Sequence, residues 1–142
     1  MKVRSIMTTP AITISPEESV AVASRTLAHY NIGMLPVCAA DGALQGVLTD
    51  RDSVTRCLAS AKDPQKTPVR DIMTHQVRTA NPDMTLSAAA HLMGSQQIRR
   101  LPVLDQGKLC GMISLGDLAN REETVYDAAD ALTEITSNIS FR

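Results

Sequence analysis

The sequence repeats itself once, and this repeat limits the fold more than any other feature. Met7-Thr8 returns as Met73-Thr74, and Leu35-Pro36-Val37 returns as Leu101-Pro102-Val103, both at an offset of 66 residues. A turn then loses one residue, and the register continues to the end of each copy. So long a register indicates two copies of one structural unit. Further matched pairs are Thr13 and Thr79, Pro16 and Pro82, Ala23 and Ala89, Ile32 and Ile98, Gly46 and Gly111, and Asp52 and Asp117.

Each copy reads as strand, helix, strand, strand, helix. Ser15-Pro16 and Asn81-Pro82 carry a capping side chain before a proline, which predicts that the first helix of each copy begins there. Asp41-Gly42 and Gly107 lie between apolar runs and predict two hairpins. Short extended pieces are expected at 12–14 and 77–79. The expected buried helix faces are Val20, Ala23, Leu27 and Tyr30; Leu86, Ala89, Ala90 and Met93; and, in the helix after the first hairpin, Val54, Cys57, Leu58 and Ala61.

One such unit is too small to bury a good core alone, so two copies should form one α+β globule, packed sheet to sheet with pseudo-two-fold symmetry. The predicted boundaries are 1–61 for the first repeat, 62–68 for a linker, 69–120 for the second repeat and 121–142 for a C-terminal helix and tail. Val125, Ala128, Leu132 and Ile135 share a helical face in the last segment. That face must pack either on its own globule or on a partner subunit.

Composition excludes several functional classes. With 14 basic and 15 acidic residues the net charge is −1, so no broad field attracts nucleic acid or membranes. Aromatic residues make up 2% of the chain, which argues against base-stacking surfaces. The three cysteines form no Cys-x-x-Cys pair and lie in apolar stretches, as expected of small buried side chains in a reducing cytoplasm. The three histidines are far apart and suggest no metal site.

The pattern Gly-x-x-Thr/Ser-x-x-Asp occurs at equivalent places in both copies, as Gly46, Thr49 and Asp52 and as Gly111, Ser114 and Asp117. A hydroxyl at the end of a strand, just before a helix, lies beside unpaired backbone N–H groups and suits an anion. A carboxylate three residues later can accept two hydrogen bonds from a vicinal diol. The same spacing also fits a plain helix cap, and both interpretations remain open at this stage.

These repeated motifs together resemble the cystathionine-β-synthase (CBS) domain family. The resemblance rests on Ile6-Met7-Thr8, the two Leu-Pro-Val segments, and the segments Gly46 to Asp52 and Gly111 to Asp117. It covers residues from about 3 to 120, nearly the whole chain. It implies a regulatory module that binds adenosine derivatives such as AMP, ADP or ATP in clefts between the two repeats. No cofactor is required, and the adenine nucleotide is expected as a regulatory ligand.

The resemblance also implies a set of ligand-binding residues. In the family the hydroxyl contacts phosphate, the carboxylate holds the ribose, and each cleft combines the base-holding residues of one repeat with the Thr/Ser and Asp of the other. The residues implied for the first repeat are Thr8, Thr13, Ile32, Gly33, Thr49 and Asp52. Those implied for the second are Thr74, Thr79, Ile98, Arg99, Ser114 and Asp117. A comparison of the two copies adds their neighbours Met34, Arg51 and Arg100 to the predicted binding residues.

The leading functional prediction is therefore a non-enzymatic, nucleotide-responsive homodimer that acts on an unidentified client protein. The alternative is a dimeric interaction scaffold with empty clefts; a small enzyme has no visible catalytic motif to support it. Arg99 and Arg100, paired with Thr49, Arg51 and Asp52, would make one cleft richer in cations than the other. Charge alone then predicts that a phosphorylated ligand binds first in that cleft, although Arg100 could instead point away along its strand.

Overall fold

The computed structural model describes residues 1–137, and the last five residues of the predicted C-terminal segment 121–142 lie outside the described residues. The chain divides into two compact units. Unit 1 contains residues 1–11, 78–106 and those from 110 onward, and unit 2 contains residues 12–77 and 107–109. The first eleven residues of the first repeat therefore fold with the second repeat. Val3 fixes them there, because its side chain is fully buried and its N–H donates to the carbonyl of Met84 at 2.9 Å.

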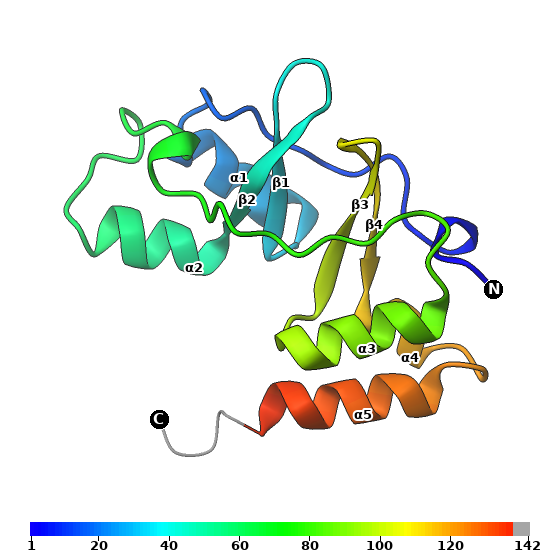
Figure 1. Ribbon diagram of the computed structural model, residues 1–142. Coiled ribbons are helices and arrows are strands. Elements are labelled where there is room, and N and C mark those ends of the chain that lie inside the picture. The colour runs from blue at the N-terminus through cyan, green and yellow to red at the C-terminus, as the bar shows by residue number, and fades with distance from the viewer. Residues whose placement is uncertain (138–142) are drawn as a thin grey trace. The chain divides into compact units, whose positions relative to one another are not determined.

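Unit 2 contains α1 (Val20–Tyr30), β1 (Met34–Cys38), β2 (Leu44–Thr49), α2 (Asp50–Asp52), the π-helix η2 (Ser53–Leu58) and the 3-10 turn η3 (Val69–Asp71) (Figure 1). Strands β1 and β2 form the predicted antiparallel hairpin, in which Leu35 lies opposite Leu48. The expected extended piece at 12–14 contributes one parallel bridge, from Ile14 to Val37. The core of this unit lies between α1 and the hairpin, with Leu27, Leu35 and Leu48 buried.

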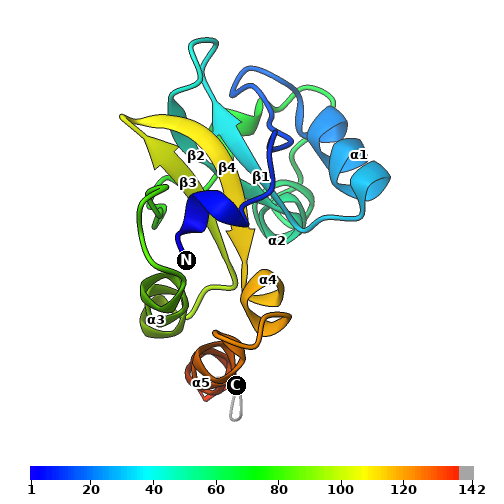
Figure 2. The ribbon, with the colours of Figure 1, turned by 90° about the vertical axis from the view of Figure 1, so that its right-hand side faces the viewer.

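Unit 1 contains the short N-terminal turn η1 (Val3–Ser5), α3 (Leu86–Gln96), β3 (Arg100–Asp105), most of β4 (Lys108–Ser114), α4 (Leu115–Ala119) and α5 (Val125–Thr136). Figure 2 shows the N-terminal segment beside β4, where Thr8 and Met112 form an antiparallel bridge. Ala80 makes one parallel bridge to Val103. Two small antiparallel sheets with surrounding helices confirm the predicted α+β class.

Both first helices start four residues later than predicted. Ser19 and Thr85 are the N-caps, and their hydroxyls accept from the N–H groups of Val22 and Ala88. The predicted cap Ser15 instead belongs to a turn, in which its carbonyl accepts from the Glu18 N–H at 3.1 Å. A proline at the second position suits such a turn as well as it suits a first helical residue, so the prediction of the helix start was wrong.

The buried face of α1 is as predicted at Val20, Ala23 and Leu27, but Tyr30 is half exposed. All four residues predicted for α3 are buried. The stripe predicted after the first hairpin is wrong except at Cys57, which is fully buried. The backbone there forms i→i+5 bonds, such as Ala59 N–H to the Val54 carbonyl, so the side chains do not follow a 3.6-residue period. Val54 and Leu58 consequently face solvent, with 55% and 61% of their surface exposed.

Helix α5 packs on its own unit, against α3 and α4 (Figures 1 and 2). Ala128, Ala131 and Ile135 are its buried residues, whereas Val125 and Leu132 of the predicted stripe are exposed. Gly94 of α3 allows the close approach, because a Cβ there would lie 3.0 Å from the Cα of Ala131. Of the two predicted alternatives, packing on its own globule therefore accounts for the buried residues of α5, and no partner subunit is required to cover them. No helix within residues 1–137 is long and apolar enough to cross a membrane.

Candidate functional site

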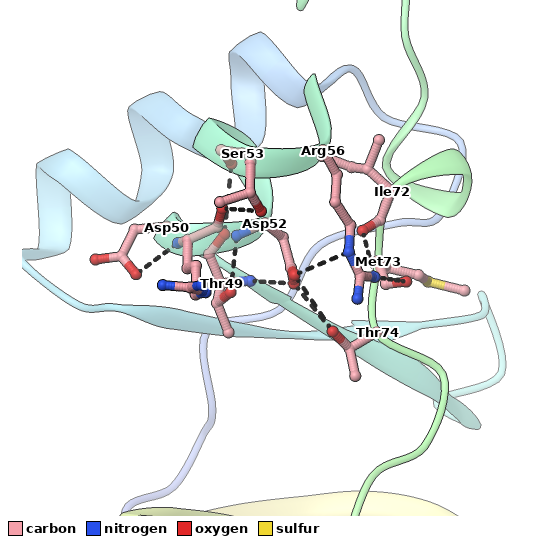
Figure 3. A network of polar contacts seen from close by, with 10 residues as sticks. Thr49, Asp50, Asp52, Ser53, Arg56, Ile72, Met73 and Thr74 are labelled. Atoms are coloured by element: carbon pink, nitrogen blue, oxygen red, sulfur yellow. Dashed lines mark hydrogen bonds and ion pairs between the residues drawn. The ribbon is translucent and has the colours of Figure 1, made fainter. Parts of the chain in front are cut away.

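The Thr49–Asp52 motif forms a reciprocal capping box at the end of β2. The Thr49 hydroxyl accepts from the Asp52 N–H at 3.0 Å, and Asp52 Oδ2 accepts from the Thr49 N–H, also at 3.0 Å (Figure 3). The capping interpretation of this spacing is therefore correct. It leaves the Thr49 hydroxyl proton and the remaining carboxylate lone pairs available, because each oxygen has more bonding capacity than the box uses.

Asp52 also contacts the beginning of the second repeat. The Thr74 hydroxyl donates to Asp52 Oδ1 at 3.4 Å and to Oδ2 at 3.2 Å. Arg56 Nε lies 3.7 Å from Oδ1, and its Nη1 donates to the carbonyls of Ile72 and Met73 at 3.3 and 3.2 Å. The Asp52 side chain is 8% exposed, so its charge is compensated by neighbouring donors (Figure 3). Residues of both repeats thus meet at one carboxylate.

The glycine of the motif is required by backbone geometry. Val47 and Thr74 exchange two backbone hydrogen bonds, at 3.0 and 2.8 Å, which bring the second repeat's opening segment against β2. A Cβ at position 46 would lie 2.5 Å from the Thr74 carbonyl oxygen, closer than real Cβ contacts occur. Gly46 therefore allows Thr74 to reach Asp52.

The second copy repeats this local geometry in unit 1. The Ser114 hydroxyl accepts from the Asp117 N–H at 3.2 Å, and Asp117 Oδ2 accepts from the Ser114 N–H at 2.8 Å. Thr8 and Met112 exchange backbone hydrogen bonds at 2.8 and 3.1 Å. A Cβ at Gly111 would lie 3.0 Å from the Thr8 carbonyl oxygen, so this glycine again admits the opening segment of the other repeat.

Comparison with known proteins agrees with this duplicated arrangement. The family model described as CBS domain matches residues 3–52 and 69–123. The chain belongs to the CBS domain family. CBS domain-containing protein YhcV of Bacillus subtilis is 41% identical over 134 residues, covering 94% of each chain.

Two solved structures show the same fold. Hypoxic Response Protein I, solved with two coordinated zinc ions, has a TM-score of 0.78 at 27% identity and covers 85% of this chain and 98% of that one. The CBS domain pair of protein MJ0100, solved with 5′-methylthioadenosine and S-adenosyl-L-methionine, has a TM-score of 0.73 at 29% identity, covering 84% and 93%. The predicted tandem CBS pair is thereby confirmed.

The expected anion site at the start of α2 has its backbone donors occupied. The Asp50 N–H donates to the Gly33 carbonyl at 3.1 Å, and the Arg51 N–H donates to Asp50 Oδ1 at 2.8 Å. The N–H groups of Thr49 and Asp52 are taken by the capping box. A phosphate at this CBS motif would therefore rely on side chains, or on displacing these internal acceptors.

The other predicted ligand residues divide between the units. Gly33 and Arg99 occupy equivalent places, because their carbonyls accept from the N–H groups of Asp50 and Leu115, respectively. Arg99 and Arg100 are exposed. The predicted grouping of these arginines with Thr49 joins residues of different units and stays a prediction. The remaining predicted residues of unit 2 are Thr13, Ile32, Met34 and Arg51, and those of unit 1 are Thr79 and Ile98.

Arg56 is the site residue that the sequence analysis missed. It lies four residues after Asp52, a spacing that places both on one helical face. The sequence prediction for this segment used only its apolar residues and therefore did not include the pair of Asp52 and Arg56.

The cysteines behave as packing residues. Burial raises the pKa of the Cys38 and Cys110 thiols, which disfavours the reactive thiolate, and all three cysteines are free. Within residues 1–137 no group of three or more His, Cys, Asp or Glu side chains is arranged to hold a metal ion.

Proposed function

We propose that this CBS pair is a non-catalytic regulatory module that binds adenosine derivatives at its two hydroxyl–carboxylate motifs and modulates a client protein in the cytoplasm. The observation that carries the proposal is the pair of a hydroxyl and a carboxylate at the end of a strand, which occurs in both repeats as Thr49 with Asp52 and as Ser114 with Asp117. Each capping box uses one carboxylate oxygen, so acceptor positions remain for a vicinal diol, which can donate two hydrogen bonds to one carboxylate.

The ligand class follows from this chemistry and from a structural neighbour. Ile32 and Ile98 are only partly buried against the cores of their units, so each keeps apolar surface for contact with a purine, while the carboxylates offer acceptors for ribose. The MJ0100 pair, solved with 5′-methylthioadenosine and S-adenosyl-L-methionine, supports an adenosine-type ligand. We therefore include unphosphorylated adenosine compounds beside AMP, ADP and ATP.

A thermal-shift panel tests the proposal. The ligands are AMP, ADP, ATP, S-adenosylmethionine and 5′-methylthioadenosine, each compared with the matching guanosine compound where one exists. A ligand at a hundred times its dissociation constant stabilises the folded chain by about 2.7 kcal/mol, which raises the melting temperature by about 5–10 °C for a chain of this size. We expect such a shift for at least one adenosine compound. A flat response to the whole panel would favour the interaction scaffold instead.

We also propose that the module is a homodimer that uses the exposed apolar face of η2. Val54 and Leu58 are both exposed residues of η2, and closed two-fold dimers are the commonest assembly. Light scattering should give twice the chain mass of 15.3 kDa for the unmodified protein and a monomer for Val54→Asp/Leu58→Asp. Tyr126→Asp, at an exposed aromatic position on α5, is the control and should remain dimeric. A monomeric unmodified chain at micromolar concentration would contradict the proposal.

A further inference from the structure

The two motifs share a capping box but differ in what else contacts the carboxylate. Asp52 has three protein partners, since Thr49 N–H and the Thr74 hydroxyl donate to it and the Arg56 guanidinium lies 3.7 Å away. The Thr74 hydroxyl reaches both carboxylate oxygens. The Thr74 hydroxyl therefore uses accepting capacity of Asp52 that a sugar hydroxyl would otherwise use.

Asp117 has a simpler environment. Within the described residues 1–137, its side chain hydrogen-bonds only to the Ser114 N–H, at 2.8 Å. Thr8 corresponds to Thr74 in the repeat, yet it is exposed and pairs with Met112 only through its backbone. An ionised carboxylate has about four lone-pair positions, so Asp117 keeps most of its accepting capacity for a ligand.

The length of the following helix explains why Asp117 lacks a counterpart of the Arg56 guanidinium that lies beside Asp52. The first copy continues from α2 into η2 as far as Leu58, so Arg56 shares a helical face with Asp52. In the second copy α4 ends at Ala119, and the corresponding Arg121 lies outside it. Arg121 instead donates to the Met1 sulfur at 2.9 Å and lies 3.7 Å from Glu123.

We propose that the Ser114–Asp117 motif is the open ribose site, which an unphosphorylated adenosine riboside fills first, and that Thr74 holds the Asp52 site in an internally bonded state. This inference rests on the proposed function and adds a ranking to it. A riboside must displace the Thr74 hydroxyl from Asp52 before its diol can bind there. Both Thr74 contacts are longer than a typical O–H···O bond, so displacement weakens binding by a modest factor and does not prevent it.

This ranking is opposite to the one that charge alone predicts. Arg51 and Arg56 lie in the same unit as Asp52 and favour a phosphate, because guanidinium–phosphate bonds are charge-assisted. An unphosphorylated riboside offers them no such partner. For that ligand the free capacity of the carboxylate decides the order of binding.

Calorimetric titration with 5′-methylthioadenosine tests the ranking on the full chain. Asp117→Asn should weaken the tighter binding event at least about a hundredfold, as expected for the loss of two hydrogen bonds to a charged acceptor. Asp52→Asn should leave that event within about twofold, because its carboxylate belongs to the weaker site. Asparagine keeps one oxygen for each capping box, so both variants should remain folded, which their melting temperatures will verify.

Thr74→Val provides an independent test of the ranking. Valine keeps the shape of threonine and removes the donor to Asp52, so the weaker event should tighten about three- to tenfold. Thr74→Ser retains the hydroxyl and is the matched control, for which no change is expected. Loss of the tighter event in Asp52→Asn, or weaker binding in Thr74→Val, would overturn the ranking alone. No binding of the riboside by the unmodified chain would overturn the proposed function together with it.

Discussion

Gly46→Ala should destabilise unit 2 by about 1–3 kcal/mol, the usual cost of forcing extra atoms into a packed position. The new Cβ would meet the Thr74 carbonyl oxygen at 2.5 Å and the Met73 sulfur at 3.2 Å. The methionine side chain can move, but the carbonyl belongs to the backbone that pairs with Val47. Either this pairing opens or β2 shifts, and both changes separate Thr74 from Asp52. Urea unfolding measures the loss.

Alanine substitutions at two other glycines, Gly111 and Gly116, provide controls for the loss of stability in Gly46→Ala. At Gly111 a new Cβ would meet the flexible Met7 side chain at 2.8 Å and the Thr8 carbonyl oxygen at 3.0 Å, a longer backbone contact than the one at Gly46, so Gly111→Ala should cost less. At Gly116 the nearest atom is Ser114 Oγ at 3.7 Å, an ordinary contact within α4. Gly116→Ala should be neutral or stabilising by up to about 1 kcal/mol, since alanine is the better helix former. A Gly46→Ala variant as stable as Gly116→Ala would contradict the close-approach argument.

Local chemistry made the hairpins predictable from sequence. Asp41 and Gly42 carry the first turn, in which the Asp41 carboxylate accepts from the Ala43 N–H and Gly42 adopts a positive φ of 91°. Gly107 has a φ of 80° in the second turn. Because the residues that need these conformations are adjacent in sequence, the pattern alone identifies both turns.

The helix starts were less predictable because two local solutions compete. Ser15-Pro16 can begin a helix or a turn, and the chain uses it as a turn. Ser19 then caps α1, although it has no proline after it to mark the position. Val20, the first residue of α1, is buried in the core, and such long-range packing is not contained in any short motif.

The local motif of the site could be predicted from the sequence, but its contact with the second repeat could not. The spacing of Thr49 and Asp52 is local and predicts the capping box directly. The contact between Asp52 and Thr74 spans 22 residues and crosses the linker, so no local pattern contains it. Arg56 was within reach of sequence reasoning through its i,i+4 spacing, but the π-helix changed which side chains of that segment are buried.

Replacing both carboxylates should have the largest functional effect. In Asp52→Asn/Asp117→Asn each new amide oxygen can still accept from the N–H of Thr49 or Ser114, so the capping boxes and the fold should persist. The variant loses both charges and the second acceptor that a ribose diol requires. Hydrogen bonds to charged groups contribute about 1.5–3 kcal/mol each, so losing two at each site should weaken binding at least about a hundredfold.

Calorimetric titration of 5′-methylthioadenosine into this double variant and into the unmodified chain tests the central claim most directly. A melting temperature close to that of the unmodified chain establishes that the variant is folded. We expect saturable binding by the unmodified chain and no measurable binding by the folded double variant at the same concentrations. Equal affinity for the two proteins would contradict the assignment of Asp52 and Asp117 as the residues that hold the ribose.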